Sequence, residues 1–226
     1  MNINNLSKSI SHCPLCTATG LQLYHQDKYR AYMQCTTCNF IFVPTSYHLT
    51  AEEEKKIYDQ HQNDIYDQGY RRFLSRVMNP LLPKLAVSAK GLDFGCGPGP
   101  ALAAMLEEKG FLINKYDLFY YPDKSVFSQR YDFITATEVI EHLADPLFYF
   151  KQWLALLKPG GWLGLMTKLV TNQRAFANWH YIRDLTHISF FSPQVLEYLS
   201  NCYPIEFEIV GNDVILIQKQ HASFLK

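Results

Sequence analysis

The chain has 226 residues, of which 48% are hydrophobic and 19% charged, and its formal net charge at pH 7 is zero. This composition excludes a disordered chain and fits one sizeable core, alone or joined to a small module. Zero net charge argues against a broad electrostatic grip on nucleic acid. The N-terminal residues show no apolar signal-peptide core, and no apolar run approaches the ~20 residues that span a bilayer. We therefore expect no membrane association and a cytoplasmic protein whose cysteines stay reduced.

Two CxxC pairs occur near the N-terminus, Cys13 with Cys16 and Cys35 with Cys38. Four thiolates at this spacing are typical of a zinc ribbon, in which the metal supplies folding free energy that a small module cannot obtain from its own core. The reducing compartment disfavours disulfides, and the presence of two pairs disfavours a redox CxxC. We expect a closed, structural zinc site in a module of residues 1–48, with a small hairpin between the pairs.

A capping box at Thr50 and Glu53 marks the start of a helix. The residues up to about position 82 are expected to be mostly helical, with a break near Gly69. This segment either bridges the zinc module to the following sheet or covers a ligand bound there, in which case Tyr70 and Arg71 are its contacts.

The stretch from Gly91 to Gly110 predicts a buried strand, a glycine loop and a helix. Glycine lacks a Cβ atom, so such a loop brings its backbone close to a ligand. Pro98 and Pro100 each remove an N–H, which makes the loop a poor cradle for the pyrophosphate of a dinucleotide. The loop is better suited to an uncharged nucleoside, although an ordinary tight turn is the alternative.

An acidic residue follows the next predicted strand, where the ribose of a nucleoside would lie. The strand over 111–116 ends at Asp117, close to the spacing of about 20 residues at which a βαβ unit places a carboxylate on ribose hydroxyls. A solvated turn aspartate is the alternative. The segment that follows is short, so we expect the third strand to be abbreviated near residues 125–127.

Strands and helices alternate through the next part of the chain. A buried strand begins at Tyr131, a helix begins at Asp145 and Pro146, and another strand spans 162–167. This alternation predicts an α/β fold with a doubly wound, mainly parallel sheet and right-handed crossovers. Ligands bind at the carboxyl ends of such strands, so the glycine loop, the aspartate after the second strand and residues 137–141 are expected to share one site.

A long connection over 168–191 follows the carboxyl end of a strand, which predicts a lid or a wall for a second substrate. A helix is expected to begin at Pro193. Two further strands over 205–210 and 214–219 are expected to form a hairpin.

Together these motifs resemble the class I S-adenosylmethionine-dependent methyltransferases. The matching stretches are LDFGCGPG at the glycine loop, Asp117, YDFITATEVIEHL at the fourth strand and LLKPGGWL before the fifth. The resemblance covers about residues 50–220 and implies that residues 49–226 form a Rossmann-like, seven-stranded methyltransferase sheet with a reversed C-terminal hairpin. WHYIRDLTHISFFSP resembles the small-molecule enzymes of the family, including sugar, quinone and natural-product methyltransferases. Some relatives also carry an N-terminal zinc module.

The resemblance implies S-adenosylmethionine as the cofactor, a nucleoside without phosphate that suits the proline-containing loop. Asp117 would accept hydrogen bonds from both ribose hydroxyls, and Glu138 would lie near the amino-acid tail or the adenosine. The residues expected to line the cofactor site are Tyr70, Asp93, Gly95, Cys96, Gly97, Gly99, Asp117, Leu118, Thr137 and Glu138.

Methyl transfer is an in-line displacement at carbon, so the protein mainly holds the two reactants together and excludes water. A base is needed only if the nucleophile carries a proton. On a helical segment His180, Asp184 and His187 would share one face, where they could form a hydrogen-bond network, a base oriented by the aspartate, or a second metal site. The candidates for catalysis are His142, His180, Tyr181, Asp184 and His187.

Three classes of function fit parts of the sequence. The first is methyl transfer to an O, N or C nucleophile of a small molecule. The second is RNA methylation with the zinc ribbon as RNA-binding module, because Lys8, Lys28 and Arg30 give that module a weak basic bias. The third is a binding module that retains the cofactor fold, which the intact glycines and acids disfavour. The neutral net charge, and the lack of the DPPY-type motif of amino-directed enzymes, favour a small-molecule acceptor over nucleic acid.

Overall fold

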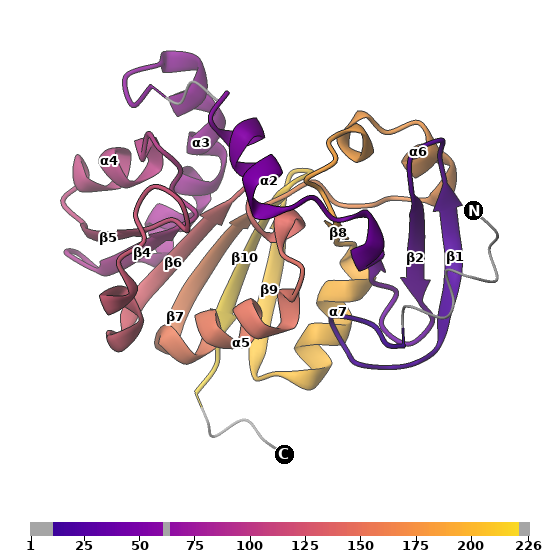
Figure 1. Ribbon diagram of the computed structural model, residues 1–226. Helices are drawn as coiled ribbons and strands as arrows, with labels where there is room; N and C mark the ends of the chain where they lie inside the picture. The colour runs from indigo at the N-terminus through magenta and orange to yellow at the C-terminus, as the bar shows by residue number, and fades with distance from the viewer. Residues whose placement is uncertain (1–10, 61–63, 222–226) are drawn as a thin grey trace.

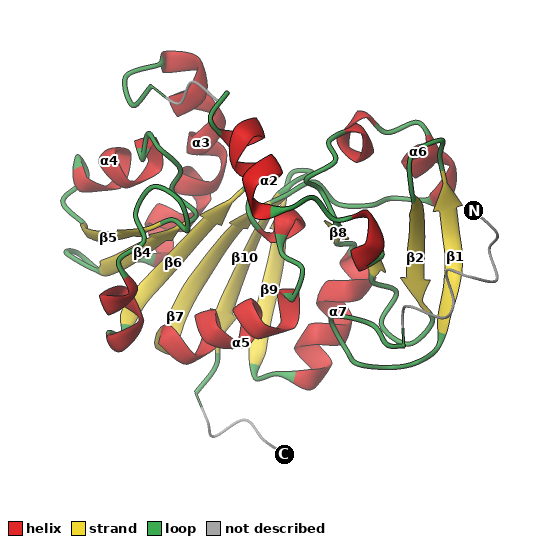
Figure 2. Cartoon of the chain, in the orientation of Figure 1, coloured by secondary structure: helices red, strands yellow, loops and turns green. Residues whose placement is uncertain are grey.

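The computed structural model of the chain describes residues 11–60 and 64–221. A six-stranded sheet lies between two helical layers, and a smaller four-stranded sheet stands beside it (Figure 1 and Figure 2). In spatial order the large sheet consists of β5 (Leu112–Tyr116), β4 (Lys90–Phe94), β6 (Tyr131–Thr137), β7 (Leu157–Met166), β10 (Val214–Lys219) and β9 (Ile205–Val210).

The pairing directions confirm the α/β, doubly wound sheet. The neighbours β5, β4, β6 and β7 are parallel, whereas β10 is antiparallel to both β7 and β9. The last two strands therefore form the reversed C-terminal hairpin, and they begin and end at the predicted residues.

The number of strands differs from the prediction. The described residues contribute six strands to the large sheet, and the segment expected as an abbreviated third strand is the 3₁₀ helix η3 (Lys124–Ser128). A β-bridge between Asp117 and Tyr121 folds the chain back directly after β5. The Asp123 carboxylate then accepts a hydrogen bond from the Ser125 N–H and begins η3. Too few residues remain before β6 for another strand and its connections, so the expectation of seven strands is wrong.

One face of the large sheet is covered by α3 (Gln68–Leu81) and α4 (Ala101–Glu107). Leu74 and Val77 of α3 and Leu106 of α4 belong to a buried cluster with Phe133 and Leu216 of the sheet. The predicted helix after the glycine loop is confirmed by α4.

The opposite face is covered by α5 (Pro146–Leu156) and α7 (Pro193–Cys202). Asp145 accepts from the Phe148 N–H at 3.0 Å, and Ser192 caps α7 in the same way, so both predicted helix starts are confirmed.

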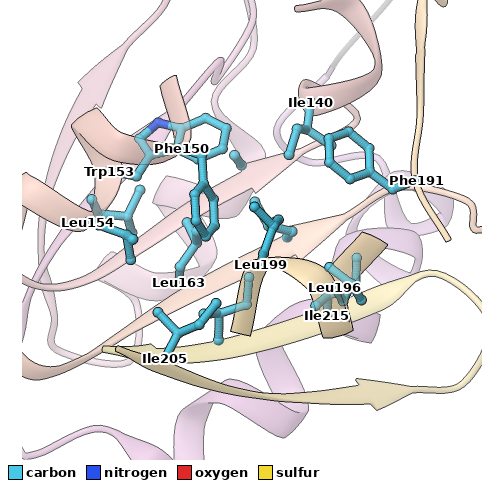
Figure 3. Close-up of a cluster of buried hydrophobic side chains, with 14 of the residues drawn as sticks. Ile140, Phe150, Trp153, Leu154, Leu163, Phe191, Leu196, Leu199, Ile205 and Ile215 are labelled. Carbon is cyan, nitrogen blue, oxygen red and sulfur yellow. The ribbon is translucent and has the colours of Figure 1, made fainter. Parts of the chain in front are cut away.

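Side chains of these two helices converge on the sheet (Figure 3). Phe150 of α5 and Leu199 of α7 are fully buried with Leu163 of β7 and Ile215 of β10. Burying one such side chain contributes about 1.5–3 kcal/mol. This packing fixes the strand ends that carry the site described below.

The segment before α3 contains α2 (Ala51–Tyr58), which begins at the predicted capping box. The Glu53 N–H donates to Thr50 Oγ1, and the Thr50 N–H donates to Glu53 Oε2. The helical run is interrupted before α3, and residues 61–63 lie outside the described residues. Figure 1 shows α2 crossing the carboxyl ends of the large sheet's strands.

The small sheet joins the N-terminal module to the long connection. The predicted hairpin is confirmed as β1 (Leu21–Gln26) and β2 (Ala31–Cys35), followed by β3 (Ile41–Phe42). The fourth strand, β8 (Ser189–Phe190), comes from the long connection and pairs antiparallel with β3. The small sheet therefore contains strands from both sides of residue 48, where the sequence predicts the boundary between the zinc module and the second domain. That boundary stays a prediction.

Short helices complete the chain: η1 (Thr45–Tyr47), η2 (Leu82–Lys84), η4 (Ile140–His142), α6 (Gln173–Ala177) and η5 (His180–Arg183). No helix in the described part of the chain has the length and apolar character needed to cross a membrane.

Candidate active site

A cavity of about 620 Å³ opens at the carboxyl ends of β4, β6 and β7, below α2 and beside the long connection. The residues that the sequence predicted for cofactor binding and for catalysis all line this cavity, except Asp93 and Gly99. The predicted residues in its wall are Tyr70, Gly95, Cys96, Gly97, Asp117, Leu118, Thr137, Glu138, His142, His180, Tyr181, Asp184 and His187.

The glycine loop has the close packing that its sequence predicts. Gly95 and Gly97 have positive φ angles of +73° and +66°, which L-amino acids with side chains rarely adopt. A Cβ atom on Gly95 would lie 2.4 Å from Val139 Cγ2. The Gly95 and Cys96 N–H groups both donate to Tyr116 O, at 2.7 and 3.2 Å, and tie the loop to the end of β5.

Asp93 lies beneath this loop rather than in the cavity wall. It is 2% exposed and accepts a hydrogen bond from Thr135 Oγ1 at 2.8 Å. Burial raises the pKa of the Asp93 carboxyl to about 6. The side chain thus joins β4 to β6 directly before the loop, and it does not line the cavity as a cofactor contact would.

Asp117 lies at the mouth of the loop with an orientation fixed by backbone amides. Its Oδ2 accepts from the Gly97 N–H at 3.0 Å, and its Oδ1 accepts from the N–H groups of Phe119 and Tyr120 at 2.8 and 3.1 Å. A carboxylate offers about four lone-pair sites. The three amides leave room for about one further donor on the Asp117 carboxylate. If Asp117 is to accept hydrogen bonds from both ribose hydroxyls, one of the amide contacts must lengthen.

Aromatic residues that the sequence reasoning did not select surround Asp117. Phe119 and Tyr120 line the cavity because the chain folds back directly after β5. The Tyr58 and Phe119 ring centroids are 6.0 Å apart, and Tyr120 OH donates to Asp59 Oδ1 at 2.7 Å. These contacts hold α2 over the part of the cavity next to Asp117. The short, aromatic-rich stretch after Asp117 was the sequence feature that could have indicated these cavity-lining residues.

Glu138 lines the cavity directly after β6 in a strained conformation. Its φ of +52° is unusual for a residue with a side chain and costs of order 1–3 kcal/mol. Its N–H donates to Met166 O at 2.8 Å, which holds this turn at the end of β6. Burial raises the pKa of the Glu138 carboxyl to about 7, against the opposing charges of Lys168 and Arg76.

Glu141 is fully buried, and the sequence predicted it only as the last of residues 137–141 at the end of a strand, without a role of its own. Tyr181 OH donates to Glu141 Oε1 and lies 3.1 Å from Thr167 Oγ1. Glu141 Oε2 has no hydrogen-bond partner among the described residues. Burial, and secondly the charge of Glu138, raise the pKa of the Glu141 carboxyl to about 8.

Two histidines from different segments meet beside Glu141. The His142 and His187 ring centroids are 4.8 Å apart with an interplanar angle of 66°. Nδ1 of His142 donates to Thr186 O at 3.1 Å, and Nδ1 of His187 donates to Tyr181 O at 2.8 Å. When each ring is neutral, its lone pair is therefore on Nε2.

The proposed shared helical face of His180, Asp184 and His187 is wrong. The 3₁₀ helix η5 ends at Arg183, and Asp184 turns the chain by accepting from both the N–H and the hydroxyl of Thr186, at 2.9 and 2.6 Å. His187 still reaches the aspartate, with Nε2 3.8 Å from Asp184 Oδ2. His180 instead lies at the exposed rim, where its Nε2 is 2.8 Å from Lys168 Nζ.

A buried arginine from the N-terminal module holds this turn. Arg30 is 2% exposed and donates to the backbone carbonyls of Ile182, Asp184 and Leu185 at 3.1, 2.9 and 2.9 Å. Its Nε donates to Tyr32 OH at 2.9 Å. The sequence suggested only a basic bias for Arg30, because its partners lie about 150 positions away.

The four N-terminal cysteines gather into one cluster. Cys13 Sγ is 3.7 Å from Cys38 Sγ, and Cys16 Sγ is 3.5 Å from Cys35 Sγ. A tetrahedral zinc site with Zn–S bonds of about 2.3 Å places its sulfur atoms about 3.8 Å apart. All four sulfur atoms lie within 4.8 Å of one another, so the cluster is compatible with a four-thiolate zinc ion.

Comparison with known proteins places this geometry among methyltransferases. Residues 66–201 match the family model described as a methyltransferase domain. A ubiquinone biosynthesis O-methyltransferase of Histophilus somni is 26% identical over 107 residues, which cover 46% of this chain and 43% of that protein. The corresponding protein of Cereibacter sphaeroides is 32% identical over 96 residues, covering 42% and 38%. The chain thus spans less than half the length of these two relatives.

A solved structure shares the fold. The 1,6-didemethyltoxoflavin-N1-methyltransferase of Burkholderia thailandensis, determined with 1,6-didemethyltoxoflavin and S-adenosylhomocysteine, aligns with a TM-score of 0.51 and 17% sequence identity. The alignment covers 88% of this chain and 100% of that one.

Proposed function

Starting from the chain's membership of the methyltransferase-domain family, which residues 66–201 match, we propose that it transfers the methyl group of S-adenosylmethionine to a hydroxyl oxygen of a small-molecule acceptor. The single observation that carries this proposal is the shared cavity. The glycine loop and Asp117, which we assign to a cofactor half, share this cavity with His142 and His187, which we assign to an acceptor half. The buried Glu141 lies beside the two histidines.

The cofactor half suits a nucleoside rather than a dinucleotide. The cavity of about 620 Å³ is within the usual range of about 300–1,000 Å³ for small-molecule sites. The backbone of Gly95 and Gly97 would contact the cofactor, Asp117 would accept from its ribose, and Phe119 would flank its base. When bound, the cofactor supplies a methyl group on a positively charged sulfur, which leaves readily.

The acceptor half suits a compact, partly aromatic molecule with a hydroxyl group. Tyr58 extends from one half to the other, because its ring centroid is 6.0 Å from that of Phe119 and 5.5 Å from that of His142. It provides apolar ring surface, while His142 and His187 provide polar atoms in the same wall. An O-directed acceptor must lose its proton, unlike many nitrogen nucleophiles, and this polar cluster can assist that loss. General acid–base assistance of this kind contributes about 10²–10⁴-fold to a rate.

RNA methylation through the zinc module is supported less well. Arg30, one of the basic residues that favoured it, is buried and occupied by backbone carbonyls. Lys8 lies outside the described residues, so among the three only Lys28 is described at the surface.

The test is to titrate the purified chain with S-adenosylhomocysteine and then to follow transfer of labelled methyl groups to a panel of phenols, catechols and sugar alcohols. We expect micromolar binding and transfer to oxygen in at least one class. Absence of S-adenosylhomocysteine binding contradicts the proposal. Transfer to RNA, with binding that weakens steeply as salt rises, would replace the acceptor class.

A further inference from the structure

We propose that Glu141, His142 and His187 bind a divalent transition-metal ion at the acceptor end of the cavity. One carboxylate oxygen and one ring nitrogen from each histidine lie within 4.8 Å of one another. Glu141 and His187 are buried and His142 is half-buried, so the ion would sit at the base of the wall rather than in open solvent. The ion's role rests on the methyl transfer proposed above, whereas its binding does not.

Both imidazoles are held in the tautomer that a metal ligand needs. A carbonyl oxygen only accepts, so the contacts of Nδ1 with Thr186 O and Tyr181 O leave the ring lone pairs on Nε2. A backbone carbonyl on the second ring nitrogen is the usual outer contact of a metal-binding histidine, because it fixes the orientation of the ring.

The Glu141 carboxylate supplies the second, independent observation. Its Oε1 is occupied by Tyr181 OH, while its Oε2 is buried and has no partner among the described residues. A buried polar atom without a partner costs about 1–3 kcal/mol, and more when it is charged. A cation bound by Oε2 and the two Nε2 atoms would remove this cost.

The surrounding charges also favour a cation. Glu138 and Asp184 line the same cavity, and Asp184 Oδ2 lies 3.8 Å from His187 Nε2. The opposing charges are Lys168, Arg76 and Arg30. Lys168 Nζ lies at the rim against His180, and Arg30 is occupied by backbone carbonyls.

The ligand types select the class of ion. Imidazole nitrogen favours zinc, iron, nickel or copper, and the carboxylate oxygen also admits manganese. Three protein ligands leave coordination positions open, which is the pattern of catalytic rather than structural zinc sites. A tetrahedral ion would draw the three ligand atoms to about 3.3 Å from one another.

The open positions would take the acceptor's hydroxyl oxygen and lower its pKa. The O–H proton then leaves to water, and an oxygen lone pair forms the bond to the methyl carbon. The carbon–sulfur bond breaks with its electron pair kept by the sulfur. The ion would thus determine both the position and the ionisation of the acceptor, which selects hydroxyl compounds over amines.

The test uses the full chain with its cysteine site already filled by zinc. Binding of further Zn²⁺ and of Mn²⁺ is measured by calorimetry, and total metal by elemental analysis. We expect one additional zinc per chain, beyond the cysteine-bound ion. We expect His187→Asn and Glu141→Gln to weaken this added binding at least tenfold. Glu141→Gln keeps an acceptor for Tyr181 OH, so it removes the charge with little disturbance of the network.

His180→Asn is the matched control, since it makes the same substitution at a histidine outside the cluster. It should retain the additional zinc. Circular dichroism and the retained cysteine-bound zinc show whether each variant is folded. Absence of zinc and manganese uptake beyond the cysteine site in the wild-type chain overturns the proposal, as does equal uptake by His187→Asn and wild type. Metal uptake without S-adenosylhomocysteine binding would leave this site standing and remove the methyl-transfer function.

Discussion

Replacing Arg30 with methionine should loosen the acceptor wall while leaving the cofactor half of the cavity nearly intact. Methionine keeps much of the apolar volume but provides no donors for the carbonyls of Ile182, Asp184 and Leu185. These three carbonyls belong to the turn that sets His187 beside Glu141. The glycine loop and Asp117 belong to other strands and make no contact with Arg30 in the described hydrogen bonds.

The magnitude follows from the number and burial of the lost contacts. A hydrogen bond that involves a charged group contributes about 1.5–3 kcal/mol, and neighbouring bonds are not additive. We therefore expect Arg30→Met to lower the free energy of unfolding by about 3–5 kcal/mol. Arg183→Met is the matched control, because Arg183 is exposed in the same turn, and it should change stability by less than about 0.5 kcal/mol.

The assay combines urea unfolding with hydrogen exchange of the amides in residues 181–188 and with S-adenosylhomocysteine titration. We expect faster exchange in that segment and an affinity for S-adenosylhomocysteine close to that of the wild type. Unchanged exchange in the segment would contradict the role of Arg30 in holding this turn. A fall in cofactor affinity while the segment stays protected would contradict it as well.

Three further changes test other parts of the account. Asp117→Ala should weaken S-adenosylhomocysteine binding about 10- to 100-fold by calorimetry, because both a ribose acceptor and three loop contacts are lost, and an unchanged affinity contradicts the ribose role. Gly95→Ala should cost more unfolding free energy than Gly110→Ala in denaturant titrations. Both glycines have a positive φ, so alanine at either position costs about 1–2 kcal/mol in backbone strain. Only at position 95 would the added Cβ atom also clash with Val139. Cys35→Ser should release the N-terminal zinc, measured by elemental analysis, and increase hydrogen exchange in the β3–β8 pair, whereas a wild-type chain without zinc would contradict the ribbon.

Much of the fold could be predicted because its signals are local. The capping box at Thr50 and the Asp145–Pro146 helix start depend on side chains within three or four residues of the backbone groups they satisfy. The C-terminal hairpin was predicted from two runs of strand-forming residues around a turn. The third strand failed because a β-bridge between Asp117 and Tyr121 used the residues that would have led into it.

The cofactor half of the site was more predictable than the acceptor half. The glycine loop and Asp117 follow consecutive strands, so the topology of a parallel sheet brings them together. Glu141 lies beside His187, and Arg30 holds the turn at Ile182, Asp184 and Leu185, through contacts between distant segments that no local pattern records. The predicted helical face of His180, Asp184 and His187 is wrong for a local reason that the sequence contains. Asp184 and Thr186 have the spacing of an Asx turn, which ends the helix before His187.

The most direct measurement for the central claim is a crystal structure of the full chain with S-adenosylhomocysteine. We expect the nucleoside against the glycine loop, a ribose hydroxyl on Asp117, and the sulfur directed toward Glu141, His142 and His187. A ligand bound outside this cavity, or a sulfur facing away from the histidine pair, would contradict the claim that one cavity joins cofactor and acceptor.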